Sequence, residues 1–120
     1  MALARTDLTP VYQVGAASTV GVVTVGSGQT VFIKSVLIHN LNLSTDQNVK
    51  VHVVPNSSGS AGSSSSITQI ARVGVATADT FFFEPAYPIV LRENGEKMIV
   101  WNEGTVTNSI NVLVHGDIEV

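Results

Sequence analysis

Charged side chains are scarce in this chain of 120 residues. They make up 12% of the sequence, about half of the roughly 25% that an ordinary soluble domain carries. Hydrophobic residues account for 44%, so uncharged polar residues take the place of the missing charges. A folded chain of this size exposes about 6,200 Å², which leaves roughly 400 Å² to each of its charged side chains. This low density indicates a surface that other protein subunits cover.

Cysteine is absent altogether. Disulfides, cysteine-based zinc sites, iron–sulfur ligation and thiol nucleophiles are therefore excluded. The net charge of −3 argues against a nucleic-acid partner, because such proteins carry a basic face. No apolar run approaches the roughly 20 residues that span a bilayer, and residues 1–17 do not have the pattern of a signal peptide. We expect a soluble protein made in a cytoplasm, with no membrane partner and no cofactor.

Helical stripes of apolar residues are also missing, and from Ser18 onward the pattern is that of short strands. Valines alternate with Lys50 and His52, for example, and Asn94-Gly95 is a strong hairpin signal. The expected strands are 18–25, 30–40, 48–55, 67–75, 80–84, 89–91, 97–102 and 110–120. Seven to eight strands at this spacing predict an all-β fold, a single antiparallel β-sandwich of jelly-roll or immunoglobulin-like type over residues 18–120.

Two segments lack this alternation. Residues 1–17 include Pro10 and Gly15 and show no clean period, so we expect an extended N-terminal arm. Such an arm either frays or lies on a neighbouring subunit, which its apolar side chains favour. Deletion of residues 1–16 is expected to leave the sandwich folded but to weaken assembly. Residues 57–66 contain seven serines, two glycines and one alanine, a composition typical of a solvated loop.

Candidate catalytic and metal sites are weak. His39, His52 and His115 fall on three different expected strands, without the spacing of a metal-ligand set. No nucleophile elbow surrounds any serine. Glu93 and Glu96 flank the Asn94-Gly95 turn, where solvated charges are usual. We predict no catalytic, metal or cofactor-binding residues and no enzyme activity.

Aromatic residues offer two further interpretations. Adjacent residues of a strand face opposite ways, so one side of Phe81-Phe82-Phe83 fills the core while the other needs a partner. Either the chain's own loops cover that side, or it is a subunit interface. Trp101 and Tyr87 could instead form a platform for stacking a sugar. The residues that we predict at an interface between subunits are Leu3, Leu8, Val11, Tyr12, Phe81 and Phe83.

Several turns and strands occur in an order that resembles a known module. Residues 25–30 (VGSGQT) lead into an apolar strand that ends at His39-Asn40, residues 49–55 (VKVHVVP) follow, and residues 91–96 (LRENGE) come later. This order resembles a small β-sandwich module of virion structural proteins of tailed bacteriophages. The chain departs from that pattern in two places, because no proline precedes Gly28 and His52 stands where an aromatic residue is common.

The resemblance implies a structural component of a tailed-phage virion. It implies above all a capsid decoration (cement) protein, which stabilises the particle through protein–protein contacts, forms a homo-oligomer and binds other virion proteins such as the major capsid protein. The alternatives are a neck, tail or fibre-attachment subunit, or a carbohydrate-binding module. The expected location is the virion, after synthesis in the host cytoplasm.

Overall fold

A computed structural model describes residues 3–7, 11–15, 17–54, 68–92, 96–104 and 110–119, with the backbone only for residues 3–7. These residues form ten strands and no helix, and all pairings among the strands are antiparallel. None of the described segments could therefore cross a membrane as an apolar helix. The predicted loop at 57–66 and the predicted turn at Asn94-Gly95 lie outside the described residues.

The first sheet, sheet A, has six strands but is only four strands wide. Two long central strands, β10 (Ile110–Glu119) and β4 (Thr30–Asn40), pair along ten positions. Each outer edge is shared by two short strands. Along β10 these are β1 (Leu3–Asp7) and β2 (Tyr12–Val14), and along β4 they are β7 (Thr80–Phe83) and β8 (Ile89–Leu91).

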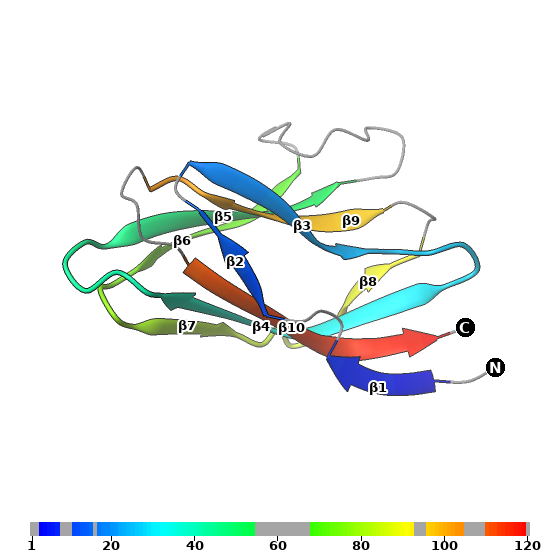
Figure 1. Ribbon diagram of the computed structural model, residues 1–120. Coiled ribbons are helices and arrows are strands. Elements are labelled where there is room, and N and C mark those ends of the chain that lie inside the picture. Colours follow the sequence, from blue (N-terminus) through cyan, green and yellow to red (C-terminus); the bar gives the residue numbers. More distant parts are fainter. Residues whose placement is uncertain are drawn as a thin grey trace.

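The second sheet, sheet B, has four strands. Its order is β3 (Ser18–Thr24), β9 (Lys97–Asn102), β5 (Gln47–Val54) and β6 (Gln69–Val75). The two sheets lie face to face (Figure 1). The antiparallel β-sandwich predicted from the sequence is thus confirmed, and strands β3 to β10 supply eight strands after residue 17.

The N-terminal arm contributes to the sheet of its own chain. β1 pairs with the last residues of β10, and β2 pairs with its first residues. Val14 in β2 is completely buried and belongs to the core cluster. That the sandwich stays folded without residues 1–16 stays a prediction, and the burial of Val14 indicates that their removal would leave a gap in the core.

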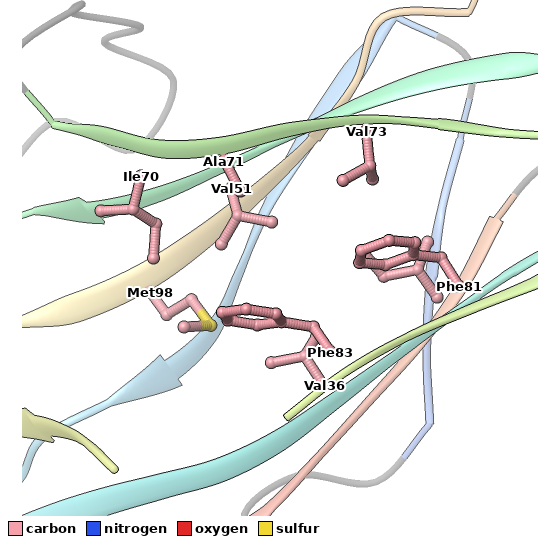
Figure 2. A pocket seen from close by; sticks show the side chains of 9 residues that line it. Val36, Val51, Ile70, Ala71, Val73, Phe81, Phe83 and Met98 are labelled. Atoms are coloured by element: carbon pink, nitrogen blue, oxygen red, sulfur yellow. The ribbon is translucent and has the colours of Figure 1, made fainter. Parts of the chain in front are cut away.

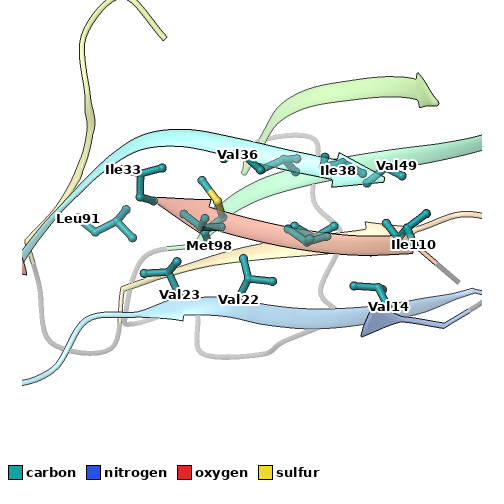
Figure 3. Packing of buried hydrophobic residues seen from close by; sticks show 14 of the residues in the cluster. Val14, Val22, Val23, Ile33, Val36, Ile38, Val49, Leu91, Met98 and Ile110 are labelled. Carbon is teal, nitrogen blue, oxygen red and sulfur yellow. The ribbon is translucent and has the colours of Figure 1, made fainter. Parts of the chain in front are cut away.

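Aliphatic side chains from both sheets meet in one core (Figure 3). Sheet A supplies Ile33, Ile38 and Ile110, among others, and sheet B supplies Val49 and Met98, all nearly inaccessible to solvent. Valine and isoleucine dominate because β-branched side chains fit a pleated, half-buried surface. The alternation that predicted the strands also separates these residues from their outward-facing neighbours.

A β-bulge interrupts that alternation within β4. Before the bulge, the side chains of Val31 and Ile33 point into the core. After the bulge, those of Val36 and Ile38 do. The register with β10 shifts at this point and leaves Lys34 without a paired residue. One extra residue reverses which positions face the core, so β4 carries large apolar residues on both faces.

Buried amides organise one end of the sandwich. The Asn40 side-chain nitrogen donates to the backbone oxygens of Thr45 and Val75, at 3.0 Å each. The Asn42 side-chain oxygen accepts from the backbone nitrogens of Ser44 and Thr45, at 2.8 and 3.0 Å. These bonds satisfy loop groups that would otherwise be buried without partners. We assign this cluster a structural role, because it ties the β4–β5 connection to the end of β6.

Candidate interaction surfaces

The outward face of sheet A carries an apolar row across three strands. Leu113 of β10 stands opposite Leu37 of β4, and Leu37 stands opposite Phe82 of β7. Their neighbours along each strand point into the core, so these three side chains point outward. Val11 continues the row, since it lines a surface hollow of about 160 Å³ together with Leu37 and Leu113. We call Val11, Leu113, Leu37 and Phe82 the outer row.

Two residues of the outer row are strongly exposed. Val11 retains 58% of its accessible surface and Phe82 retains 54%, while Leu37 and Leu113 are half-buried. Phe32 and Val90 form a second cross-strand pair on the same face, and both are half-buried. The outer row alone forms a continuous apolar area, and such an area marks an interaction site more often than scattered single residues do.

An ion pair lies on this face at the β4 bulge. Lys34 forms an ion pair with Asp117 of β10, with 2.5 Å between the ammonium nitrogen and a carboxylate oxygen. Asp117 is almost fully buried although it pairs with Phe32 on the outward side. The bulge places the lysine where it compensates this buried carboxylate. The pair therefore neutralises charge beside the apolar face.

The outward face of sheet B has a different character. Glu103 accepts hydrogen bonds from Arg72 at 3.3 and 3.1 Å and forms an ion pair with Lys50 at 3.1 Å. The Arg72 guanidinium and the Lys50 ammonium lower the pKa of the Glu103 carboxyl. The three charged side chains belong to β5, β6 and the residue that follows β9, so this face carries a charged cluster, whereas sheet A carries the apolar outer row.

The two aromatic residues of the proposed sugar platform belong to different sheets. Trp101 lies in β9 of sheet B and is half-buried, with the Lys50 ammonium nitrogen 4.6 Å from its ring centroid. Tyr87 lies between β7 and β8 of sheet A and is 85% exposed. The structure therefore provides no joint platform made by these two described residues.

The three histidines also remain apart in the sheet layout. His39 and His115 lie on the outward side of sheet A, and the Nδ1 atom of His39 is 2.9 Å from the Thr80 hydroxyl. His52 is in sheet B, buried, with Nδ1 3.0 Å from the Thr68 hydroxyl. Burial and the nearby Lys50 ammonium lower the pKa of His52. No metal-binding group of three or more His, Asp or Glu residues occurs in the described part of the chain.

The phenylalanines of β7 divide between the two sides of sheet A. The sequence prediction assigned the interface to Phe81 and Phe83, but these two are partly buried and pack against the core. Phe82 is the outward residue, because the register sets Phe81 and Phe83 beside the inward-facing Ile38 and Val36. The sequence predicted that the three phenylalanines alternate between the two sides of the sheet. Which of them face outward depends on the pairing of β7 with β4.

The remaining predicted interface residues lie in the N-terminal arm. Val11 is exposed and joins the outer row, while Tyr12 is partly buried and packs against the core. Leu3 pairs with Glu119 through β1, and Leu8 lies outside the described residues. The sequence prediction did not include Leu37 and Leu113. The expected strand at 30–40 has apolar residues on both faces, and this pattern could have indicated that one face contacts another surface. Their contact with another subunit stays a prediction.

Comparison with known proteins supports the fold alone. No protein-family model and no curated protein matches the chain. Among solved structures, the chain is similar to a crystal structure of PirA, with a TM-score of 0.51 and 13% sequence identity. The similarity covers 92% of this chain and 94% of the PirA chain. At this level of identity the two share an architecture, and no functional residue is transferred from one to the other.

Proposed function

We propose that this protein is a structural subunit that works through protein–protein contacts made by the outer row of sheet A. Its partners are copies of itself and other virion proteins such as the major capsid protein. The role proposed is a decoration (cement) subunit on the capsid of a tailed phage, and a neck, tail or fibre-attachment subunit is the alternative position. The observation that carries the proposal is the unequal character of the two outer faces.

The contrast between these faces gives the proposal its physical basis. The outer row presents apolar side chains that gain free energy when another surface removes them from water, by about 25 cal/mol for each Å² of apolar surface buried. The whole chain exposes 6312 Å² and carries 6 basic and 9 acidic residues, which leaves about 420 Å² for each charge. Few charges therefore have to be desolvated when the apolar face is covered.

The resemblance in residues 25–30, 49–55 and 91–96 to a virion module supports the more specific part of the proposal. A decoration subunit needs a stable sandwich and a face that fits another subunit, and it needs no catalytic group. The sandwich is present, and the exposed outer row of sheet A supports the proposal of such a face.

The self-association part is tested with Phe82→Glu and Leu113→Glu. We expect the unchanged chain to sediment as an oligomer and each variant to associate at least tenfold more weakly, because a charge would be buried in an apolar contact. Leu43→Glu is the matched control, since Leu43 is 82% exposed in the β4–β5 connection and does not line the hollow beside the outer row. Sedimentation velocity at several concentrations measures the effect, and circular dichroism shows that each variant is folded.

A chain that is monomeric at all concentrations would contradict self-association through this face. The proposal that the protein belongs to a virion has a separate test. This test is mass spectrometry of purified tailed particles from the organism in which the protein is made. Stoichiometric presence of the chain in those particles supports the proposal, and its absence from them overturns it. Comparable copy numbers of this chain and the major capsid protein would favour the decoration role over the neck or tail.

A further inference from the structure

A cavity of about 120 Å³ lies between the two sheets, on the side where β6 and β7 form the sheet edges. Figure 2 shows its side chains converging from opposite layers, with the rings of Phe81 and Phe83 directed toward sheet B. Val36 and Met98 are among the buried lining residues. The full lining is Val36, Ile38, Val51, Ile70, Ala71, Val73, Phe81, Phe83 and Met98.

An irregularity in β6 shapes the mouth of this cavity. The register between β5 and β6 shifts after Val51 and leaves Ile70 as an extra residue. Ile70 and Ala71 consequently both line the cavity although they are adjacent in sequence. Ile70 remains 49% exposed, whereas Met98 is inaccessible to solvent. The cavity therefore runs from an accessible rim at Ile70 into the buried core.

The lining contains apolar side chains only. Water in such a space would lose hydrogen bonds that the walls cannot replace, and apolar cavities of about 150 Å³ are known to stay dry and to bind benzene. A ligand with a charge or an unpaired polar group would lose the same hydrogen bonds. The volume and the chemistry of the walls thus select a small uncharged hydrocarbon.

Entry does not require a strand to separate from its sheet. Among the described pairings, β6 bonds only to β5 and β7 bonds only to β4. A ligand that passes between β6 and β7 therefore breaks none of these backbone hydrogen bonds. Ile70 lies at the rim and is half exposed, and exposed side chains of this kind change rotamer within nanoseconds.

We propose that this cavity is a binding site for a small, uncharged hydrocarbon group about the size of a benzene ring. The site is independent of the outer row, because it lies between the sheets whereas the outer row lies on the outward face of sheet A. Phe81 and Phe83 supply aromatic walls, and Ile70 covers the entrance. Filling the space restores dispersion contacts that the lining side chains lack.

Benzene is the probe for this proposal, followed by methyl-detected NMR of the full chain. We expect saturable shifts at the methyl groups of Ile70, Val73 and Met98, with a dissociation constant on the order of 1 mM. Phenol, which adds one hydroxyl group to the same ring, is expected to bind at least tenfold more weakly because that hydroxyl would lack a partner.

Ala71→Leu tests the location of the site. The larger side chain occupies the cavity, so we expect at least a tenfold loss of benzene affinity with an unchanged or higher melting temperature. Ala86→Leu is the matched control, because Ala86 is exposed between β7 and β8 and does not line the cavity. This control should bind benzene as the unchanged chain does.

Three results would overturn the proposal: no saturable benzene shifts, shifts confined to methyl groups away from the cavity, or equal binding by Ala71→Leu. Shift mapping on the unchanged chain keeps the test decisive if Ala71→Leu does not fold. The self-association measured for the outer-row variants provides a separate outcome, so failure of one proposal does not imply failure of the other.

Discussion

The ammonium nitrogen of Lys50 lies 4.6 Å from the ring centroid of Trp101, its cross-strand neighbour in the β5–β9 pair. A cation over an indole face contributes about 0.5–1 kcal/mol at an exposed site. The same ammonium pairs with Glu103, which also accepts from Arg72. An aromatic ring, two cations and one carboxylate thus form one connected group on sheet B, with Lys50 over one face of the Trp101 ring.

Replacement of the Glu103 carboxylate should change how stability depends on pH. The Arg72 and Lys50 side chains hold the pKa of Glu103 below its ordinary value of 4.5, so its contribution is complete above that pH and is lost as the pH falls through the lowered pKa. We expect Glu103→Gln to lower the free energy of unfolding at pH 7 by about 0.5–1 kcal/mol, because the pair is partly exposed. The two stability curves should converge in acid. Urea unfolding at a series of pH values measures this, and Glu84→Gln is the control at an exposed position. A difference that persists unchanged in acid would contradict the assignment.

His52 should cause a second loss of stability in a higher pH range. Its buried ring, beside Lys50, has a pKa lowered from the ordinary 6.5, so the unfolded chain takes up a proton at a pH where the folded chain does not. The associated stability is therefore present above pH 6.5 and decreases as the pH falls from there to the lowered pKa. His52→Gln should remove this decrease, while His39→Gln on the outward face of sheet A should retain it. Guanidinium unfolding between neutral and mildly acidic pH distinguishes the variants. An identical pH dependence in His52→Gln and the unchanged chain would refute the prediction.

Gly104 is required by its close neighbours. A Cβ atom at this position would lie 2.6 Å from the Gln47 side-chain oxygen and 3.0 Å from that of Asn102, within the buried amide region. We expect Gly104→Ala to lower the free energy of unfolding by about 1–3 kcal/mol, because buried groups must move apart. Gly21→Ala is the control, since its nearest contact is the flexible Lys97 side chain at 4.0 Å. Thermal unfolding of both variants provides the measurement, and equal melting temperatures would contradict the expectation.

The N-terminal arm should contribute to folding stability through Val14. This residue is completely buried, and its backbone oxygen accepts a hydrogen bond from the Asn102 side chain at 3.3 Å. We expect Val14→Ala to cost about 2 kcal/mol by creating a cavity, whereas Val11→Ala at an exposed site should cost less than about 0.5 kcal/mol. Removal of residues 1–16 should destabilise the chain more than Val14→Ala does, because it deletes both β1 and β2. Chemical unfolding of the truncated chain checks this, and full stability without residues 1–16 would show that the arm is dispensable.

The alternation of residues along the chain determined the strands, and with them the β-sandwich. The expected segments 30–40 and 97–102 coincide with β4 and β9, because a period of two is a local property of the backbone. The same signal indicated that β7 has one inward and one outward aromatic side. The sequence alone could not show which phenylalanines of β7 face the core, because that depends on the residues of β4 that lie opposite them.

Only the tertiary structure decided where alternation is interrupted and what the strands enclose. The bulges at Lys34 and Ile70 are pairing irregularities between strands distant in sequence, so no local pattern announces them. The first bulge gives β4 its reversal of inward and outward residues, and the second places Ile70 at the rim of the cavity. Val14 entered the core for the same reason, because its burial depends on pairing with Ile110 at the opposite end of the chain. Which residues face outward, and which empty space they leave inside, is set by these long-range pairings.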